Sequence, residues 1–270
     1  MAQQDLTGKI AFVSGSGRGL GNVMARKLAG RGADVIVHDL SWNETSKYGE
    51  ASDLGNVVKQ IEGIGVRSMA VTGNIGDRDA VNAMRKEIEE KFGRVDILVN
   101  CAGGDIGASG NKPEPNNILG ITYEDLMTLT NNNLIGTMLM TQAFVPQMVE
   151  RQSGIVVNIA SVAAHIGVSH GGIYATLKAA VTHYTRCLAD EVREFGVRVN
   201  AVSPGPAKTA RFQATRVVDP DKMNSNKASF NRYAEPEEIA DGVVFLCSPE
   251  AKFIHGQLLR VDGGLQLYAG

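Results

Sequence analysis

A chain of 270 residues that is 43% hydrophobic and 21% charged can bury a sizeable core. Its formal net charge of −2, without long basic runs, argues against a nucleic-acid partner. The polar start and the lack of a long apolar run predict neither a signal peptide nor a membrane span. Three cysteines without ligand spacing predict no disulfide and no metal site. We expect a single cytoplasmic domain over residues 1–270.

A glycine-rich turn follows the first predicted strand. Residues 9–14 form an apolar run, and Gly15, Gly19 and Gly21 then precede a helical pattern. Glycines at such a turn let the backbone approach a pyrophosphate at the helix N-terminus. The spacing is G-x-x-x-G-x-G and differs from the common G-x-G-x-x-G. We predict cofactor contacts from Gly15, Arg18, Gly19 and Leu20.

The second predicted strand, residues 34–39, ends in an acid, Asp39. A carboxylate there can accept hydrogen bonds from both hydroxyls of an adenosine ribose, and it repels a 2′-phosphate. Asp39 therefore favours NAD over NADP. Arg18 leaves two interpretations open, because it can meet a 2′-phosphate or lie in solvent. The polar stretch 40–52 is predicted to be a surface loop near the adenine.

Strands and helices alternate through the rest of the chain. We predict strands at 67–71, 95–100, 155–160, 197–203 and 257–261, and helices near 53–62, 77–92, 122–151 and 236–247, with another through Tyr174 to about 195. This order predicts an α/β fold: a Rossmann-type doubly wound domain, mainly a seven-stranded parallel sheet with helices on both faces. Ligands bind such sheets at the carboxyl ends of strands. The residues at those ends add Asn74, Ile75, Asn100, Ala102 and Gly103 to the expected cofactor site.

The stretch 155–178 predicts a proton-transfer site. Its strand delivers Ser161 to a carboxyl end, and the next helix carries Tyr174 and Lys178 at i and i+4, on one face. A neighbouring ammonium favours a phenolate, so we expect Lys178 to lower the pKa of Tyr174. Each residue alone is also compatible with packing or capping.

Taken together, these motifs resemble the classical short-chain dehydrogenases/reductases over nearly the whole chain. Ser14-Gly15-x-x-x-Gly19-x-Gly21 is similar to the family's cofactor loop, and Asn100-Cys101-Ala102-Gly103 to its Asn-Asn-Ala-Gly motif, with Cys in the second place. The family's four catalytic positions correspond to Asn133, Ser161, Tyr174 and Lys178. The segment beside the nicotinamide corresponds to Pro204, Gly205, Ala207 and Thr209.

The resemblance implies an NAD-dependent oxidoreductase that interconverts a secondary alcohol and a ketone, or a sugar lactol and lactone. Tyr174 would be the general base or acid and Ser161 would orient the substrate oxygen. Lys178 would bind the nicotinamide ribose, and Asn133 would hold a water in a proton relay. It also implies a homotetramer or homodimer.

Three segments are expected to line the substrate pocket: 105–121, 163–172 and a mobile, partly helical lid at about 205–233. His165, His170 and Arg211 are candidate substrate contacts beside Ser161. Lys208, Arg211 and Arg216 form either an anion site or a solvated basic face.

These segments favour a small substrate such as a sugar, sugar acid or polyol. Two alternatives stay open: a 3-oxoacyl thioester or cyclic-alcohol/ketone reductase that uses NADPH, and an NADH-binding sensor without turnover.

Overall fold

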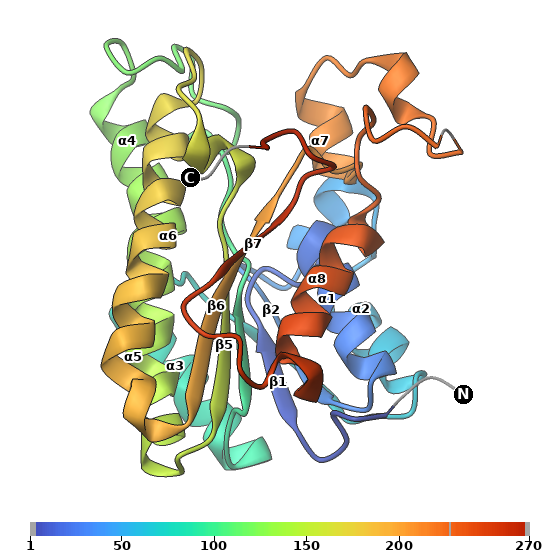
Figure 1. Ribbon diagram of the computed structural model, residues 1–270, viewed down its shortest axis with the longest axis vertical. Coiled ribbons are helices and arrows are strands. Elements are labelled where there is room, and N and C mark those ends of the chain that lie inside the picture. The colour runs from blue at the N-terminus through green and yellow to red at the C-terminus, as the bar shows by residue number, and fades with distance from the viewer. Residues whose placement is uncertain (1–3, 227, 268–270) are drawn as a thin grey trace.

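The computed structural model describes residues 4–226 and 228–267 and places one parallel sheet between two layers of helices (Figure 1). The strand order is β3-β2-β1-β4-β5-β6-β7, which confirms the predicted seven-stranded, doubly wound α/β fold. The strands are β1 (Ile10–Val13), β2 (Asp34–Asp39), β3 (Ser68–Thr72), β4 (Ile97–Asn100), β5 (Gly154–Ile159), β6 (Val197–Pro204) and β7 (Leu258–Val261). The helices are α1 (Gly19–Gly30), α2 (Leu54–Glu62), α3 (Arg78–Phe92), α4 (Tyr123–Thr130), α5 (Gly136–Glu150), α6 (Gly172–Val192), α7 (Ala210–Thr215) and α8 (Pro236–Cys247).

Alternate residues of each strand fill the two faces of the sheet. Phe12 lies in register with Ile36 and Leu98, and all three pack in the core cluster that contains α3 and α5. The next residue, Val13, pairs with Val99 and packs in the other cluster, with α1 and α8. Because helices cover both faces, the strands read as continuous apolar runs in the sequence.

The helix predicted over 122–151 is interrupted at its three consecutive asparagines. Helix α4 ends at Thr130, a π-helical turn covers Asn131–Ile135, and α5 follows. The buried Asn133 amide explains this turn, because its Nδ2 donates 2.9 Å hydrogen bonds to the carbonyls of Leu129 and Gly104. A π turn inside an α-helix often marks a functional position.

The stretch 40–52, predicted to be a surface loop, is more ordered than expected. A 3-10 helix covers Glu44–Tyr48, and Thr45 in it is fully buried. Lys47 Nζ donates a 3.2 Å hydrogen bond to the Gly110 carbonyl, so this stretch reaches the segment 105–121.

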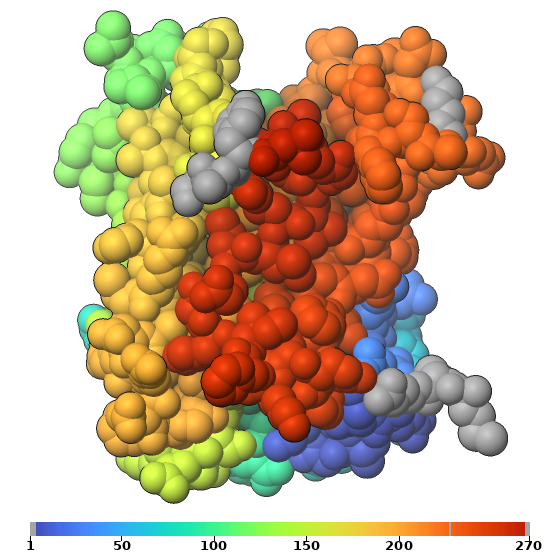
Figure 2. Space-filling model, in the orientation of Figure 1, coloured from blue at the N-terminus to red at the C-terminus, as the bar shows by residue number. Residues whose placement is uncertain are grey.

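Strand order reverses between β1 and β4, which opens a crevice at their carboxyl ends. In the space-filling view, the green and yellow segments on one side and the orange segment of α7 on the other rise around a notch at this end of the molecule (Figure 2). No helix among the described residues is long and apolar enough to cross a membrane.

Candidate active site

A cavity of about 860 Å³ lies at the carboxyl ends of the strands. It is lined by the glycine-rich turn, by the residues after β2, β4, β5 and β6, and by the starts of α6 and α7. Asn100, Asn133 and His165 are not among the described residues that line it. The predicted site residues that it does bring together are Gly15, Arg18, Gly19, Leu20, Asp39, Asn74, Ile75, Ala102, Gly103, Ser161, His170, Tyr174, Lys178, Pro204, Gly205, Ala207, Thr209 and Arg211.

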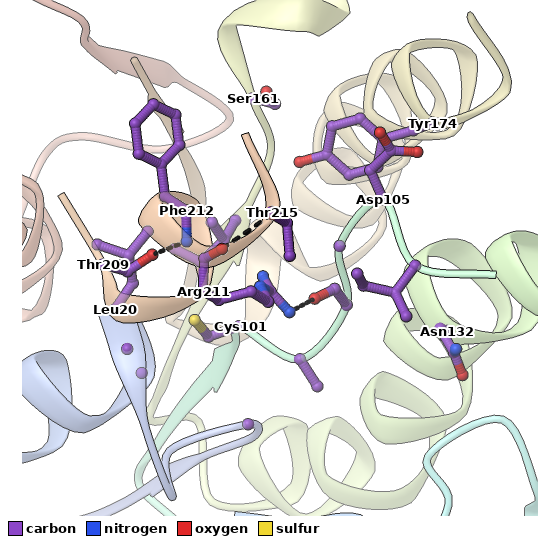
Figure 3. A pocket seen from close by; sticks show the side chains of 18 of the residues that line it. Leu20, Cys101, Asp105, Asn132, Ser161, Tyr174, Thr209, Arg211, Phe212 and Thr215 are labelled. Carbon is purple, nitrogen blue, oxygen red and sulfur yellow. Dashed lines mark hydrogen bonds between the residues drawn. The ribbon is translucent and has the colours of Figure 1, made fainter. Parts of the chain in front are cut away.

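Ser161, just after β5, and Tyr174, on α6, both line this cavity (Figure 3). Lys178 of α6 also lines it. Ser161 caps the short turn after β5, where its Oγ accepts a 3.2 Å hydrogen bond from the N–H of Ala163. One turn of α6 separates Tyr174 from the buried Lys178. The Lys178 ammonium donates a 2.9 Å hydrogen bond to the Ile159 carbonyl and lies 5.7 Å from the centre of the Tyr174 ring.

The electrostatics of this group differ from the sequence prediction. Burial raises the pKa of Tyr174, and the opposing influences are a hydrogen bond with Ser161 and the charges of Arg211 and Arg216. The expected lowering by Lys178 is not found, since the charges that act on the Tyr174 phenol are those of Arg211, Arg216 and Asp105. Burial also lowers the pKa of Lys178 to about 8.

Asn133 lies behind the cavity wall and fixes it. Its Oδ1 accepts a 2.9 Å hydrogen bond from the N–H of Gly104, and its Nδ2 donates to the carbonyls of Gly104 and Leu129. The neighbouring Gly103 has φ +128°, and a Cβ there would lie 2.6 Å from the Asn133 amide oxygen. Both amide hydrogens and one acceptor position of the side chain are therefore used in holding the turn after β4 and the helix before Asn133.

Two other predicted contacts point away from the cavity. The amide of Asn100 donates a 2.9 Å hydrogen bond to Asn158, which in turn donates to the Thr185 hydroxyl, so this chain joins β4 and β5 to α6. His165 Nε2 lies 3.1 Å from the buried Ser203 hydroxyl. Neither side chain lines the cavity, although both lie next to residues that do.

The glycine-rich turn packs closely on the segment after β4. Gly15 has φ +66°, and a Cβ there would lie 2.8 Å from the Cα of Ala102 across the crevice. His38 was not predicted from the sequence, but its ring supports this turn. Its Nδ1 accepts a 3.1 Å hydrogen bond from the N–H of Gly15, and its Nε2 lies 2.9 Å from the Gly73 carbonyl. The sequence feature that could have indicated this role is a polar residue, His38, inside the apolar strand 34–39.

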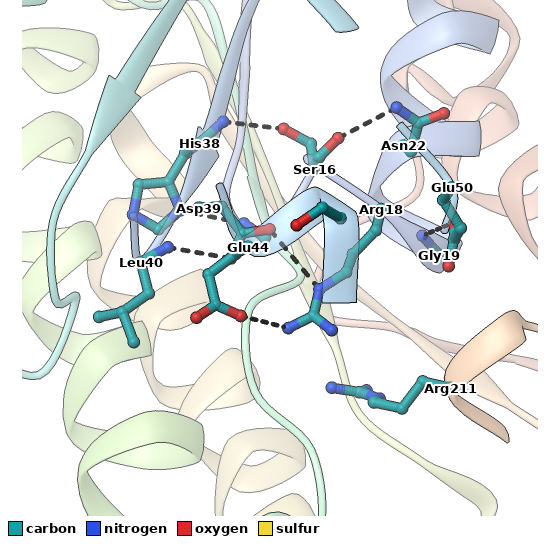
Figure 4. A network of polar contacts seen from close by, with 12 residues as sticks. Ser16, Arg18, Gly19, Asn22, His38, Asp39, Leu40, Glu44, Glu50 and Arg211 are labelled. Atoms are coloured by element: carbon teal, nitrogen blue, oxygen red, sulfur yellow. Dashed lines mark hydrogen bonds and ion pairs between the residues drawn. The ribbon is translucent and has the colours of Figure 1, made fainter. Parts of the chain in front are cut away.

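Arg18 is partly buried and is held between two acids (Figure 4). Its Nη2 lies 3.1 Å from Glu44 Oε2, and its Nε lies 3.9 Å from Asp39 Oδ2. The guanidinium also stacks 5.0 Å from the ring centre of Tyr48. Burial raises the pKa of Asp39, while the Leu40 N–H and Arg18 oppose that shift. Glu44 was not singled out in the sequence, because only the fold brings it to the glycine-rich turn.

The predicted basic cluster is rearranged at the other end of the cavity. Lys208 pairs with Glu235 at 2.7 Å and does not line the cavity. Arg211 and Arg216 do line it, and Lys112 from the segment 105–121 joins them. Arg211 Nη1 donates a 3.2 Å hydrogen bond to the Gly103 carbonyl (Figure 3).

The whole arrangement matches known oxidoreductases. Residues 15–266 match a family model described as enoyl-(acyl carrier protein) reductase. A cyclohexanol dehydrogenase of Rhodococcus sp. (strain TK6) is 35% identical over 96% of this chain and 97% of that protein. The chain belongs to the short-chain dehydrogenase/reductase family.

Other relatives fit this assignment. A 3-oxoacyl-[acyl-carrier-protein] reductase of Thermotoga maritima is 32% identical over 96% of this chain and 98% of that protein. The solved structure of a 7α-hydroxysteroid dehydrogenase with NADH and 7-oxoglycochenodeoxycholic acid superposes with a TM-score of 0.83, at 30% identity, over 97% of this chain and 96% of that one. This short-chain dehydrogenase/reductase is thus an oxidoreductase that acts on alcohol and keto groups of small molecules with a nicotinamide cofactor.

Proposed function

We propose that this chain is one catalytic domain that uses NAD to oxidise a secondary alcohol, or a sugar lactol, of a small hydroxylated molecule such as a sugar, sugar acid or polyol. The observation that carries the choice of NAD is the position of Arg18. The cation that would meet a 2′-phosphate is already paired with Glu44 and lies next to Asp39. Two carboxylates at this position repel a 2′-phosphate and suit ribose hydroxyls.

The proposed chemistry follows from the residues at the cavity. When bound, the nicotinamide supplies hydride transfer to or from the substrate carbon. The Tyr174 hydroxyl donates its proton to the substrate oxygen during reduction, and the phenolate takes it back during oxidation. Ser161 hydrogen-bonds to the same oxygen. Lys178 binds the nicotinamide ribose, and the segment 205–233 acts as the substrate lid.

The test is a panel of sugars, sugar acids, polyols and cyclic alcohols with NAD⁺, followed by NADH absorbance, with NADP⁺ for contrast. Tyr174→Phe removes the transferable proton and is expected to lower kcat at least ~10²-fold with NAD affinity unchanged. Tyr184→Phe, on the same helix but outside the cavity lining, is the matched control and should keep its rate. Near-normal turnover in Tyr174→Phe would contradict the assignment, and NADH binding without any turnover would favour the sensor.

A second candidate is a cyclic alcohol. The cavity lining includes Ile106, Ile166, Val168 and Phe212, an apolar surface that a ring can contact. The identity with the Rhodococcus cyclohexanol dehydrogenase supports the same substrate class. The panel distinguishes the two candidates by their kcat/KM values. A 3-oxoacyl thioester with NADH and NADPH is the next substrate if both classes fail.

We also propose a homotetramer or homodimer that forms through the helices near Asn133 and Tyr174 and through the last strand. Strand β7 is an edge of the sheet, so one side of it is available for pairing. Light scattering of the purified protein tests this, and a monomeric mass would contradict it. The chain ends in a short tail, residues 265–270, and its residues 268–270 lie outside the described residues.

A further inference from the structure

Charged residues divide the cavity into two ends. The carboxylates of Asp39, Glu44 and Glu50 line the end beside the glycine-rich turn. At the other end, beside Tyr174, the cations outnumber the acids, although the charge of Arg211 also reaches Asp39. Three cations line that end: Lys112, Arg211 and Arg216.

These three cations come from two separate segments. Lys112 belongs to the segment 105–121, Arg211 lies in the first turn of α7, and Arg216 directly follows α7. The Arg216 guanidinium stacks 5.2 Å from the ring centre of Phe212. Because two segments supply them, the cluster is produced by the fold and is not a run of charge in the sequence.

The cluster carries an excess of positive charge over the Asp105 carboxylate that lines the same end. Among the described residues, none of its three members forms an ion pair. Asp105 also lines this end, and its two carboxylate oxygens accept hydrogen bonds of 3.2 and 3.0 Å from the Asn116 amide. Burial and the charge of Arg216 lower the pKa of Lys112, and the charge of Asp105 opposes that shift. An anion placed among the cations would relieve this repulsion, and a guanidinium matches a carboxylate with two parallel hydrogen bonds.

We propose that Lys112, Arg211 and Arg216 bind a carboxylate of the substrate, so that the natural substrates are small hydroxy acids. The alcohol end of the molecule reaches Tyr174 and Ser161, while the carboxylate is held at the mouth of the cavity. The position of the alcohol group rests on the proposed function. The carboxylate site depends only on the three cations, so binding measurements can test it without any turnover.

The experiment measures binding to the NADH-loaded protein by calorimetry. The probes are cis-4-hydroxycyclohexanecarboxylate and its primary amide, which has nearly the same shape but no charge and one acceptor oxygen fewer. The carboxylate is expected to bind roughly tenfold more tightly than the amide. In Lys112→Met/Arg216→Met this ratio should fall to about one, with NADH affinity and circular dichroism unchanged. Lys86→Met, at an exposed position on α3, removes one positive charge outside the cluster and should keep the ratio.

Several results would overturn the carboxylate site. These are equal affinity of the two probes for the unmodified protein, no measurable carboxylate binding, or an unchanged ratio in the double variant. Tighter binding of trans-4-hydroxycyclohexyl phosphate than of the carboxylate would reassign the cluster to a phosphate. In Tyr174→Phe the ratio should persist while turnover is lost, which separates this inference from the proposed function.

Discussion

The carboxylate of Glu50 accepts a 2.6 Å hydrogen bond from the backbone N–H of Gly19, in the first turn of α1. An N–H at this position is one that a cofactor pyrophosphate would use. The side chain comes from the stretch 40–52, which also contacts Gly110 through Lys47. Glu50 and a dinucleotide therefore compete for the same donor, and both are negatively charged.

Removing this competition should strengthen cofactor binding. Glu50→Gln keeps the size of the side chain but removes its charge and weakens it as an acceptor. We expect the Kd for NAD⁺ to fall by roughly 3- to 10-fold, measured by calorimetry. Glu62→Gln, an exposed position of α2, is the control with the same charge change and should leave Kd unaltered. Weaker NAD⁺ binding in Glu50→Gln would mean that the carboxylate assists the cofactor.

Cofactor choice should respond to Glu44. In Glu44→Gln the partner 3.1 Å from Arg18 loses its charge, which leaves the guanidinium available to a 2′-phosphate. We expect kcat/KM for NADP⁺ to rise about tenfold, while the value for NAD⁺ changes little. Adding Arg18→Met to this variant should cancel the gain. If NADP⁺ use is the same with and without Glu44, then Asp39 alone sets the preference.

Acid should destabilise the protein through His38. Burial lowers its pKa from 6.5 to about 4, so between these values the unfolded chain binds a proton that the folded chain does not. This contribution to the free energy of unfolding is complete above pH 6.5 and is lost as pH falls toward 4, by about 3 kcal/mol in total. Urea unfolding across this window should show a smaller pH slope in His38→Gln. If the two proteins show the same pH dependence of the unfolding free energy, protonation of His38 does not cause the acid destabilisation.

The sequence predicts two features well: the order of the strands along the chain and the helix face shared by Tyr174 and Lys178. Both depend on local sequence patterns. Buried parallel strands appear as apolar runs, and the i, i+4 spacing alone places Tyr174 and Lys178 on one helix face. Side-chain direction across loops has no such pattern. Closeness in sequence therefore grouped Lys208 with Arg211. In the structure Lys208 pairs with Glu235, and Lys112 is the lysine that lines the cavity with Arg211.

The other wrong predictions have the same cause: the direction of a side chain and its distant neighbours cannot be read from the sequence. His165 lies close to Ser161 in the chain, but its ring turns to Ser203 on β6. Arg18 has two acidic neighbours that lie 21 and 26 residues away in sequence and meet it only after folding.

The hydrogen-bonded chain from Asn100 through Asn158 to Thr185 ties two central strands to α6, and so fixes the reacting groups to the rigid part of the molecule. The segments 105–121 and 205–233, which supply the cations, lie outside that chain of bonds. The residues proposed for substrate recognition and those proposed for proton transfer thus lie in separate parts of the protein. Exchange of the two segments between homologues should yield enzymes with new substrates and an intact proton-transfer apparatus.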